Sequence, residues 1–222
     1  MVVPSKANLN RFSAGAGALA RYLSEPVVTV LLILGAFGLR TWNLDAQSLW
    51  WDEGFSLNLA GQNFWAIVRG DFHPPLYHLL LAGWIRLAGT SEFAARYFSV
   101  ACGTLLIPVA YRLGRRLFDA TTGQLAALLV ASSPVLLWYS QETRMYILVA
   151  LIYLTLIWLF HRLTDPAAPP APPRLWIAFA IVELAGLYTH YFVALGIAWL
   201  LLAMLIRHYA IRNTQYVPRV AN

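Results

Sequence analysis

Apolar runs separated by short polar segments make up most of this chain. Six of these runs are predicted to be membrane-spanning helices, at residues 27–44, 93–113, 123–139, 143–160, 175–188 and 191–206. A proline-rich linker at 165–174 separates the fourth run from the fifth, because consecutive prolines favour extended chain over helix. The pattern therefore predicts an all-α fold, a polytopic membrane helix bundle of about six spans.

A seventh apolar run, at 74–85, is shorter than the others and is interrupted by His78. As a helix it would be roughly 18 Å long at about 1.5 Å per residue, whereas the hydrocarbon core of a bilayer is about 30 Å thick. We therefore predict a helix at 74–87 that lies in the outer interface and does not cross the membrane.

The distribution of basic residues gives an independent test of this topology, since cytoplasmic loops are enriched in Lys and Arg. If 74–85 does not span and the N-terminus is inside, eleven of the sixteen basic residues are cytoplasmic. If it does span, only six are. The sequence thus predicts a multi-pass protein of the cytoplasmic (inner) membrane with a cytoplasmic segment 1–25, a membrane module 26–206 with an outer loop at 43–92, and a cytoplasmic tail 207–222.

Composition supports the membrane assignment and excludes a soluble globule. The 222 residues are 59% hydrophobic and only 12% charged, against about 25% charged in a typical soluble domain. Mean hydropathy is +0.60. The formal net charge of +6 is attributed to cytoplasmic Lys and Arg, so no nucleic-acid partner is expected. A single cysteine, Cys102, excludes an internal disulfide.

The run from Ser48 to Ser56 contains the most informative chemistry, because the adjacent acids Asp52 and Glu53 follow two tryptophans just after the first span. Acidic residues near a bilayer are costly and tend to mark function. One of the two is expected to act as a general base while the other binds a hydroxyl group or a metal. The alternative is an ordinary solvated acidic loop, against which the flanking aromatic side chains argue.

Under the predicted topology, polar groups from several distant segments fall on the outer face together with the acidic pair. These candidates are His73, Arg96, Gln141, Glu142, Arg144, His190 and Tyr191. Each also has a structural reading: His73 as a helix cap, Glu142 and Arg144 as a mutual ion pair, and His190 with Tyr191 as part of an aromatic belt. Arg40 is expected to extend its side chain to the interface. Acidic residues and histidines share this face, but no tight metal-ligand spacing occurs among them. Whether a divalent metal binds is therefore left open.

The order of several short motifs resembles the bacterial family 39 glycosyltransferases, which are similar to protein O-mannosyltransferases, aminoarabinose transferases and rhizobial lipopolysaccharide galacturonosyltransferases. The resemblance covers about residues 30–206 and rests on Arg40, Ser48-Leu49-Trp50-Trp51-Asp52-Glu53, His73-Pro74-Pro75-Leu76-Tyr77, Phe93-Ala94-Ala95-Arg96, Gly114-Arg115-Arg116-Leu117-Phe118, Ser133-Pro134, Ser140-Gln141-Glu142-Thr143-Arg144-Met145-Tyr146 and Tyr188-Thr189-His190-Tyr191.

This resemblance implies a GT-C fold and a polyprenyl-phosphate-linked sugar donor. It maps the catalytic acid of the first outer loop to Asp52, with Glu53 beside it, and the donor-phosphate arginine to Arg96. Glu142 matches a second family acid by position only. Relatives are usually longer, so the variable C-terminal half of the family is expected to be absent here, and the 222-residue chain is expected to be the common module.

The sequence therefore predicts a glycosyltransferase that moves a sugar to a glycan, lipid or protein acceptor, with inversion, at the outer membrane surface. Asp52 and Glu53 are the predicted catalytic residues. Arg96, Arg144 and His73 are predicted to bind the donor phosphate, and the predicted substrate-binding residues are Gln141, Glu142, His190 and Tyr191. The rival hypotheses are a transporter or lipid-handling protein, for which midplane polar groups and repeated halves would be expected, and a non-catalytic partner subunit or truncated module.

Overall fold

The computed structural model describes residues 25–165 and 168–214, and every regular element in those ranges is an α-helix. The predicted all-α class is therefore confirmed. Most of the predicted segment 1–25 and the end of the predicted tail 207–222 lie outside the described residues. The helices are α2 (Glu25–Thr41), α3 (Trp51–Ala60), α4 (Phe64–Arg69), α5 (Leu76–Ala88), α6 (Glu92–Leu117), α7 (Ala120–Ser132), α8 (Pro134–Ser140), α9 (Tyr146–Leu163), α10 (Pro173–Leu187) and α11 (Val193–Thr214).

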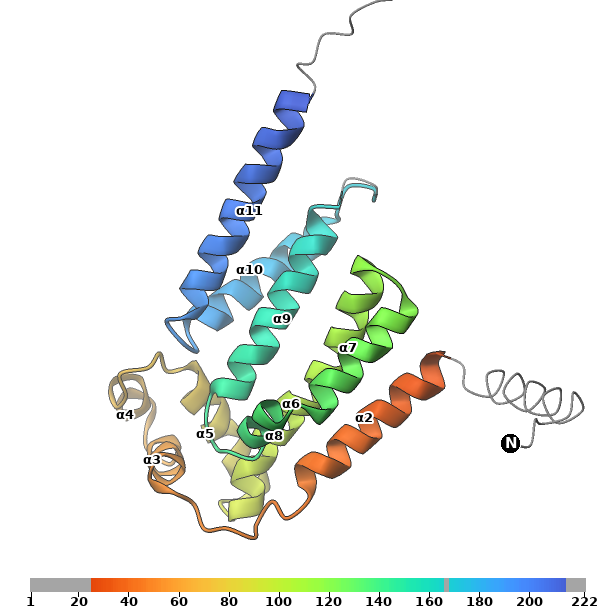
Figure 1. Cartoon of the computed structure of the whole chain (residues 1–222). Helices are drawn as coiled ribbons and strands as arrows, with labels where there is room; N and C mark the ends of the chain where they lie inside the picture. Colours follow the sequence, from red (N-terminus) through yellow and green to blue (C-terminus); the bar gives the residue numbers. More distant parts are fainter. Residues whose placement is uncertain (1–24, 166–167, 215–222) are drawn as a thin grey trace, which may run out of the picture.

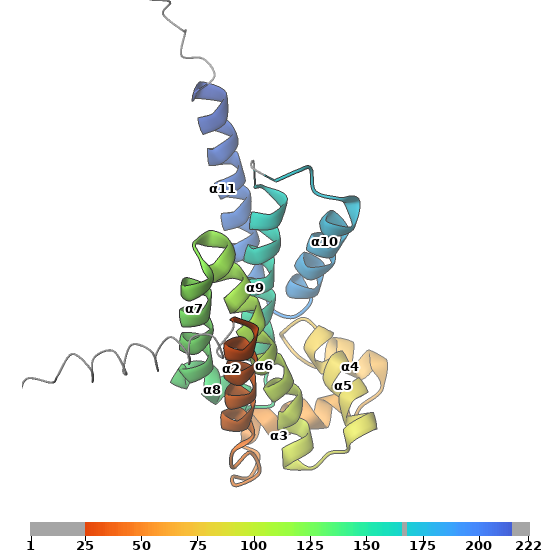
Figure 2. The same cartoon turned by 90° about the vertical axis from the view of Figure 1, so that its right-hand side faces the viewer.

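The helices form an elongated bundle in which α6 packs against α2, α7 and α9 (Figures 1 and 2). The short helices α3, α4 and α5 gather at one end, where α2 ends and α9 begins. We call this the α3–α5 end of the bundle. The turn between α6 and α7 at its opposite end follows from local capping, since Asp119 accepts a 2.7 Å hydrogen bond from the Thr122 N–H and so starts α7 directly after α6.

Two described helices, α6 and α9, are long and apolar enough to cross a membrane, and a third span results if α7 and α8 are counted together. The predicted membrane bundle is consistent with these helices. The predicted number of six spans stays a prediction: α2 has 17 residues and α10 has 15, which is about 26 Å and 22 Å of helix.

Helix α5 corresponds to the predicted interfacial helix at 74–87 and begins two residues later than expected, after Pro74 and Pro75. It is too short to count as a span. Its buried side chains, including Tyr77 and Leu81, pack against Ile67 of α4 and Met145 in one apolar cluster. This cluster fastens α5 to the other segments at the α3–α5 end. Its position in the membrane interface stays a prediction.

The predicted run at 123–139 is not one straight helix. It breaks at Ser133, and α7 and α8 meet there at an angle of 58°. Proline lacks a backbone N–H and collides with the carbonyl four residues earlier, so a helix cannot continue straight through Pro134. The Ser133 hydroxyl instead accepts the Leu136 N–H at 3.5 Å and starts α8.

This break explains Arg40, which does not reach the interface as expected but is fully buried. Its guanidinium donates to the carbonyls of Val130 (3.1 Å) and Ala131 (3.2 Å) and to the Ser140 hydroxyl (3.1 Å). The last carbonyls of α7 have no intrahelical partners, and the negative end of a helix dipole favours a cation. Arg40 therefore joins α2 to both sides of the break.

We predict that Gly103→Ala destabilises the protein by about 1–3 kcal/mol, because small-to-large changes in tight packing are destabilising. A methyl group on Gly103 would overlap Ser140 Oγ and lie 3.0 Å from Arg40 Nε. The matched control is Gly83→Ala in α5, where an added methyl meets nothing within 4 Å. Thermal unfolding in lipid nanodiscs measures both, and equal melting temperatures would contradict the proposed packing role of Gly103.

Candidate functional site

Helix α3 begins at the tryptophan–acid run singled out in the sequence, and its start determines how the two acids differ. Trp50 is extended, and its N–H donates to the Glu53 carboxylate at 3.4 Å, as in the second half of a capping box. Glu53 is thereby directed back toward the start of the helix. Its side chain is only 1% exposed, whereas that of Asp52 is 40% exposed.

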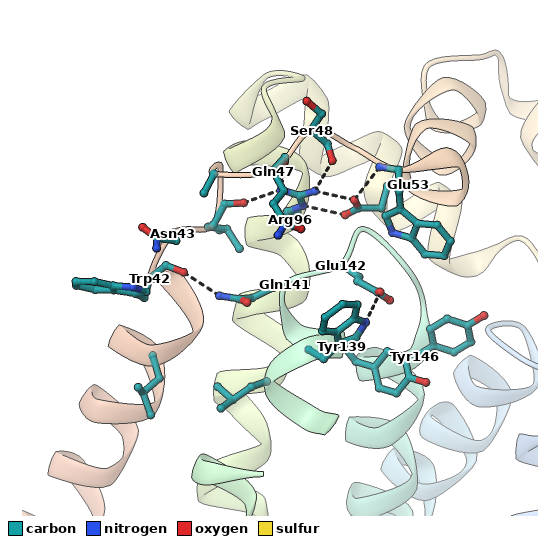
Figure 3. A pocket seen from close by; sticks show the side chains of 16 residues that line it. Trp42, Asn43, Gln47, Ser48, Glu53, Arg96, Tyr139, Gln141, Glu142 and Tyr146 are labelled. Carbon is teal, nitrogen blue, oxygen red and sulfur yellow. Dashed lines mark hydrogen bonds and ion pairs between the residues drawn. The ribbon is translucent and has the colours of Figure 1, made fainter. Parts of the chain in front are cut away.

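Glu53 forms a two-pronged ion pair with Arg96 of α6 (Figure 3). Arg96 donates from Nε to Glu53 Oε1 at 2.9 Å and from an η nitrogen to Oε2 at 2.8 Å. Oε1 also accepts the Thr143 N–H at 2.8 Å. A parallel pair of charge-assisted hydrogen bonds is among the stronger polar contacts in proteins. Glu53 therefore joins α3 to α6 and to the loop that precedes α9.

The other N–H groups of Arg96 are also engaged, by the backbone before α3. They donate to the carbonyls of Leu44 (2.8 Å), Gln47 (2.7 Å) and Ser48 (3.3 Å). With Glu53, these acceptors account for all five donors of the guanidinium. Arg96, predicted to bind the donor phosphate, thus has no N–H free for a phosphate in this structure. The observed contacts fit a role in holding the 44–48 loop.

Asp52 and Arg144 lie together on another side of α3. An η nitrogen of Arg144 is 3.9 Å from Asp52 Oδ2, and another donates to the Ser56 hydroxyl at 3.1 Å. Arg144 is buried, and its Nε has no hydrogen-bond partner. The Arg144–Asp52 contact is long, and one Arg144 donor has no acceptor. This pair can therefore form further hydrogen bonds, whereas the donors and acceptors of Arg96 and Glu53 are already occupied. The predicted mutual pair of Glu142 with Arg144 does not form an ion pair within 4 Å among the described residues.

A cavity of about 900 Å³ opens beside the Glu53–Arg96 pair, between the end of α2, the loop before α3, α8 and the start of α9. Figure 3 shows Gln141, Glu142, Tyr139 and Tyr146 around it. Asp52 is not among its lining residues. Glu142 accepts the Trp138 indole N–H at 2.5 Å. Burial raises the pKa of the Glu142 carboxyl above its ordinary value.

The third group of candidates lies where the loop before α5 meets the turn between α10 and α11. His73 contacts Asp71 at 3.3 Å, and the His73 and His190 rings are 5.0 Å apart between centroids. Tyr191 donates its hydroxyl proton to the Phe72 carbonyl at 2.7 Å. A backbone hydrogen bond of 2.9 Å from Leu76 to Tyr188 completes the joint. Chain segments more than a hundred residues apart thus meet in one contact region.

Two members of this group, Asp71 and His78, were not among the predicted site residues. His78 is fully buried, and its Nε2 is 3.7 Å from Asp71 Oδ2. Burial lowers the pKa of His78 to about 4 and lowers the pKa of His190 as well. The sequence could have indicated both residues by their position, because Asp71 and His78 lie close to the predicted His73 in the chain. Among the described residues, no group of three or more His, Cys, Asp or Glu side chains has the arrangement of a metal site.

Comparison with protein families identifies the chain at the level of the family. Residues 72–220 match the family described as dolichyl-phosphate-mannose-protein mannosyltransferase. The chain belongs to this mannosyltransferase family. No curated protein and no solved structure matches it. Membership points to a membrane glycosyltransferase and agrees with the resemblance seen in the motifs. The finer likeness to aminoarabinose or galacturonosyl transferases stays a prediction.

The family match begins after the acidic pair and includes all of the remaining candidates. Residues 52 and 53 precede it, whereas the candidates within it are His73, Arg96, Gln141, Glu142, Arg144, His190 and Tyr191. The structure links the acidic pair to the matched region, because Glu53 accepts hydrogen bonds from two segments inside it.

We predict that Glu53→Gln costs about 3–5 kcal/mol of stability, because it leaves the Arg96 charge buried without a counterion. Asp45→Asn, which removes a charge from an exposed loop residue, is the control and is expected to be close to neutral. Denaturant or thermal unfolding in nanodiscs gives the comparison. If Glu53→Gln unfolds like the wild type, the ion pair does not hold this end of the bundle together.

A second prediction concerns the pH dependence of stability at Glu142. Because burial raises its pKa in the folded state, the wild type loses stability as pH rises from the ordinary carboxyl pKa through the raised one, while Glu142→Gln does not. The melting temperatures of the two proteins should therefore agree near about pH 4, and the variant should be more stable near about pH 7. A difference that is the same at both pH values would contradict this assignment.

Proposed function

We propose that this chain transfers a sugar from a polyprenyl-phosphate-linked donor to an acceptor hydroxyl, with inversion, at the α3–α5 end of the bundle on the outer face of the cytoplasmic membrane, with the N-terminus inside. The carrying observation is the half-exposed Asp52 carboxylate, which lies 3.9 Å from a buried arginine that has an unused donor. A base beside a cationic phosphate site is what this transfer needs.

In this proposal Asp52 is the base, and Glu53 is a positioning residue. Glu53 accepts hydrogen bonds from Arg96, Thr143 and Trp50 and is nearly inaccessible, so it is poorly placed to take a proton. Asp52 would take the acceptor hydroxyl proton as that oxygen bonds to the anomeric carbon. The bond from that carbon to the phosphate oxygen breaks, and the lipid phosphate leaves with its electron pair.

Arg144 is the residue best suited to hold the leaving phosphate. Its Nε is buried without a partner, and an unpartnered buried donor costs free energy that a phosphate oxygen would recover. His190 supports it. The His190 Nδ1 accepts the Phe192 N–H at 3.2 Å, so the proton of the neutral ring lies on Nε2 and is free to donate. His73 is engaged by Asp71 through its Nδ1, and we give it a lesser share of phosphate binding than the sequence indicated.

The remaining predicted substrate residues divide between two places. Gln141 and Glu142 line the cavity, and we propose that they contact a sugar, in the donor or in a glycan, lipid or protein acceptor. Tyr191 donates to the Phe72 carbonyl, so we propose that it holds the contact region near His190 in place and leaves direct binding to its neighbours. The donor sugar and the acceptor are not distinguished by these contacts.

The distribution of polar side chains favours an enzyme over a transporter. Asp52, Glu142, Arg144 and His190 come from three segments that meet at the α3–α5 end, as the contacts of Glu53 with Thr143 and of Leu76 with Tyr188 require. A transporter would be expected to collect such groups near the middle of its spans. A non-catalytic partner subunit would need no free carboxylate, and the following variant separates it from an enzyme.

We predict that Asp52→Asn lowers the rate of sugar transfer by about 10²–10⁴-fold, the usual contribution of a positioned general base, while lipid binding is retained. The assay measures transfer from a polyprenyl-phosphate mannose donor by the wild type and the variant in proteoliposomes. Asp45→Asn removes a carboxylate from an exposed loop outside the site and should retain activity. Equal turnover by Asp52→Asn would remove Asp52 from the role of base.

A further inference from the structure

Among the described residues that line the 900 Å³ cavity, the net charge is negative. Two of its lining residues, Glu53 and Arg96, neutralise each other, and every Arg96 donor already has an acceptor. The nearby Arg40 guanidinium does not line the cavity and is directed to the carbonyls of the α7–α8 break and to Ser140. The unpaired charge left on the lining is the Glu142 carboxylate.

Two polar side chains of the cavity lining, Glu142 and Gln141, each keep an acceptor oxygen that no described donor uses. Glu142 uses one oxygen to accept the Trp138 N–H, which leaves the other available. The side-chain amide nitrogen of Gln141 donates to the carbonyls of Arg40 (3.2 Å) and Trp42 (2.9 Å). Its side-chain oxygen is left as an acceptor. Such acceptors bind hydroxyl and ammonium groups, and they repel a carboxylate or phosphate.

Aromatic rings make up much of the remaining lining. Trp42, Trp50, Trp138, Tyr139 and Tyr146 surround the acceptors, and a mostly apolar wall with a few placed polar groups is the usual form of a small-molecule site. Flat ring faces can cover the C–H side of a pyranose while the acceptors take its hydroxyl groups. The volume of about 900 Å³ is ample for one or two sugar rings.

We propose that this cavity binds a sugar ring that carries hydroxyl or amino groups and no negative charge, and that it rejects uronic acids and phosphorylated sugars. The assignment of that ring to a substrate rests on the proposed function, but the binding preference itself does not. Without a free cation on the lining, an anionic ring would face Glu142 directly. We expect at least about tenfold weaker binding of an anionic ring than of its uncharged counterpart.

Direct binding tests the preference without any turnover. Saturation-transfer NMR on the full chain in lipid nanodiscs, near neutral pH, is applied to three probes: methyl mannopyranoside, a methyl aminopyranoside and methyl galacturonopyranoside. Nanodiscs are needed because maltoside detergents would themselves supply sugar rings. We expect binding of the first two probes and at least about tenfold weaker binding of the third. Equal binding of all three, stronger binding of the uronate, or binding of none would overturn the proposal.

The variant Glu142→Gln tests which group causes the rejection. Removing the carboxylate while keeping an amide of similar shape should reduce the discrimination against the uronate by about tenfold, because the negative charge that repels the uronate is gone. Asp45→Asn is the matched control, because Asp45 is next to lining residues but does not line the cavity, and its preference should equal that of the wild type. If Glu142→Gln fails to fold, the ranking of the probes by the wild type decides alone.

The two proposals fail separately. Sugar transfer by the wild type together with no preference among the probes would overturn the cavity assignment and leave the function standing. A clear preference without transfer from any lipid-linked donor would do the reverse. Where both hold, competition of the preferred probe against lipid donor marks the cavity as the donor-sugar site, and competition against acceptor marks it as an acceptor site.

Discussion

The ion pair between Glu53 and Arg96 is the interaction on which the α3–α5 end depends. It lies where four segments meet: the 44–48 loop, α3, α6 and the loop before α9. A buried carboxylate and guanidinium are each expensive to remove from water, and the pair persists because every remaining hydrogen-bonding position is also occupied. One consequence concerns chemistry. A fully hydrogen-bonded Glu53 orients the start of α3, and Asp52 next to it is left with a half-exposed carboxylate whose contact with Arg144 is 3.9 Å long.

A second buried arginine performs a similar task inside the bundle. Arg40 binds the carbonyls released where α7 breaks at Pro134, and its own carbonyl accepts the Gln141 side chain. The proline break, the end of α2 and the segment carrying Gln141 and Glu142 are therefore one connected unit. Gly103 permits it, since any side chain there would overlap Ser140. The cavity takes its shape from this unit, although no residue of the break itself has catalytic chemistry.

These two arginines explain how a strongly basic chain can present a cavity without a free cation. Arg40 and Arg96 donate their N–H groups to backbone carbonyls, to Ser140 and to Glu53. These contacts are favourable because both side chains are buried away from water. Arg144 differs, because its Nε is buried without a partner and it faces the carboxylate of Asp52 only at 3.9 Å. This division of charge is the basis of the two proposals: anion binding near Arg144, and binding of uncharged or amino groups near Glu142.

The sequence by itself determined the all-α membrane class, most helix positions and the family, because apolar periodicity, low charge content and motif order are local properties of the chain. It also predicted that polar groups from distant segments gather on one face, and several of these segments meet at the α3–α5 end. It did not separate Asp52 from Glu53, place Arg40 or detect the bend at Ser133, and it assigned Arg96 to phosphate binding. Partners 43 and 90 residues away from Glu53 decided the roles of the two acids and of Arg96. Partners about 90 to 100 residues away decided the burial of Arg40. Burial and pairing depend on which neighbours arrive, so only the tertiary structure could make one acid structural and leave the adjacent one free.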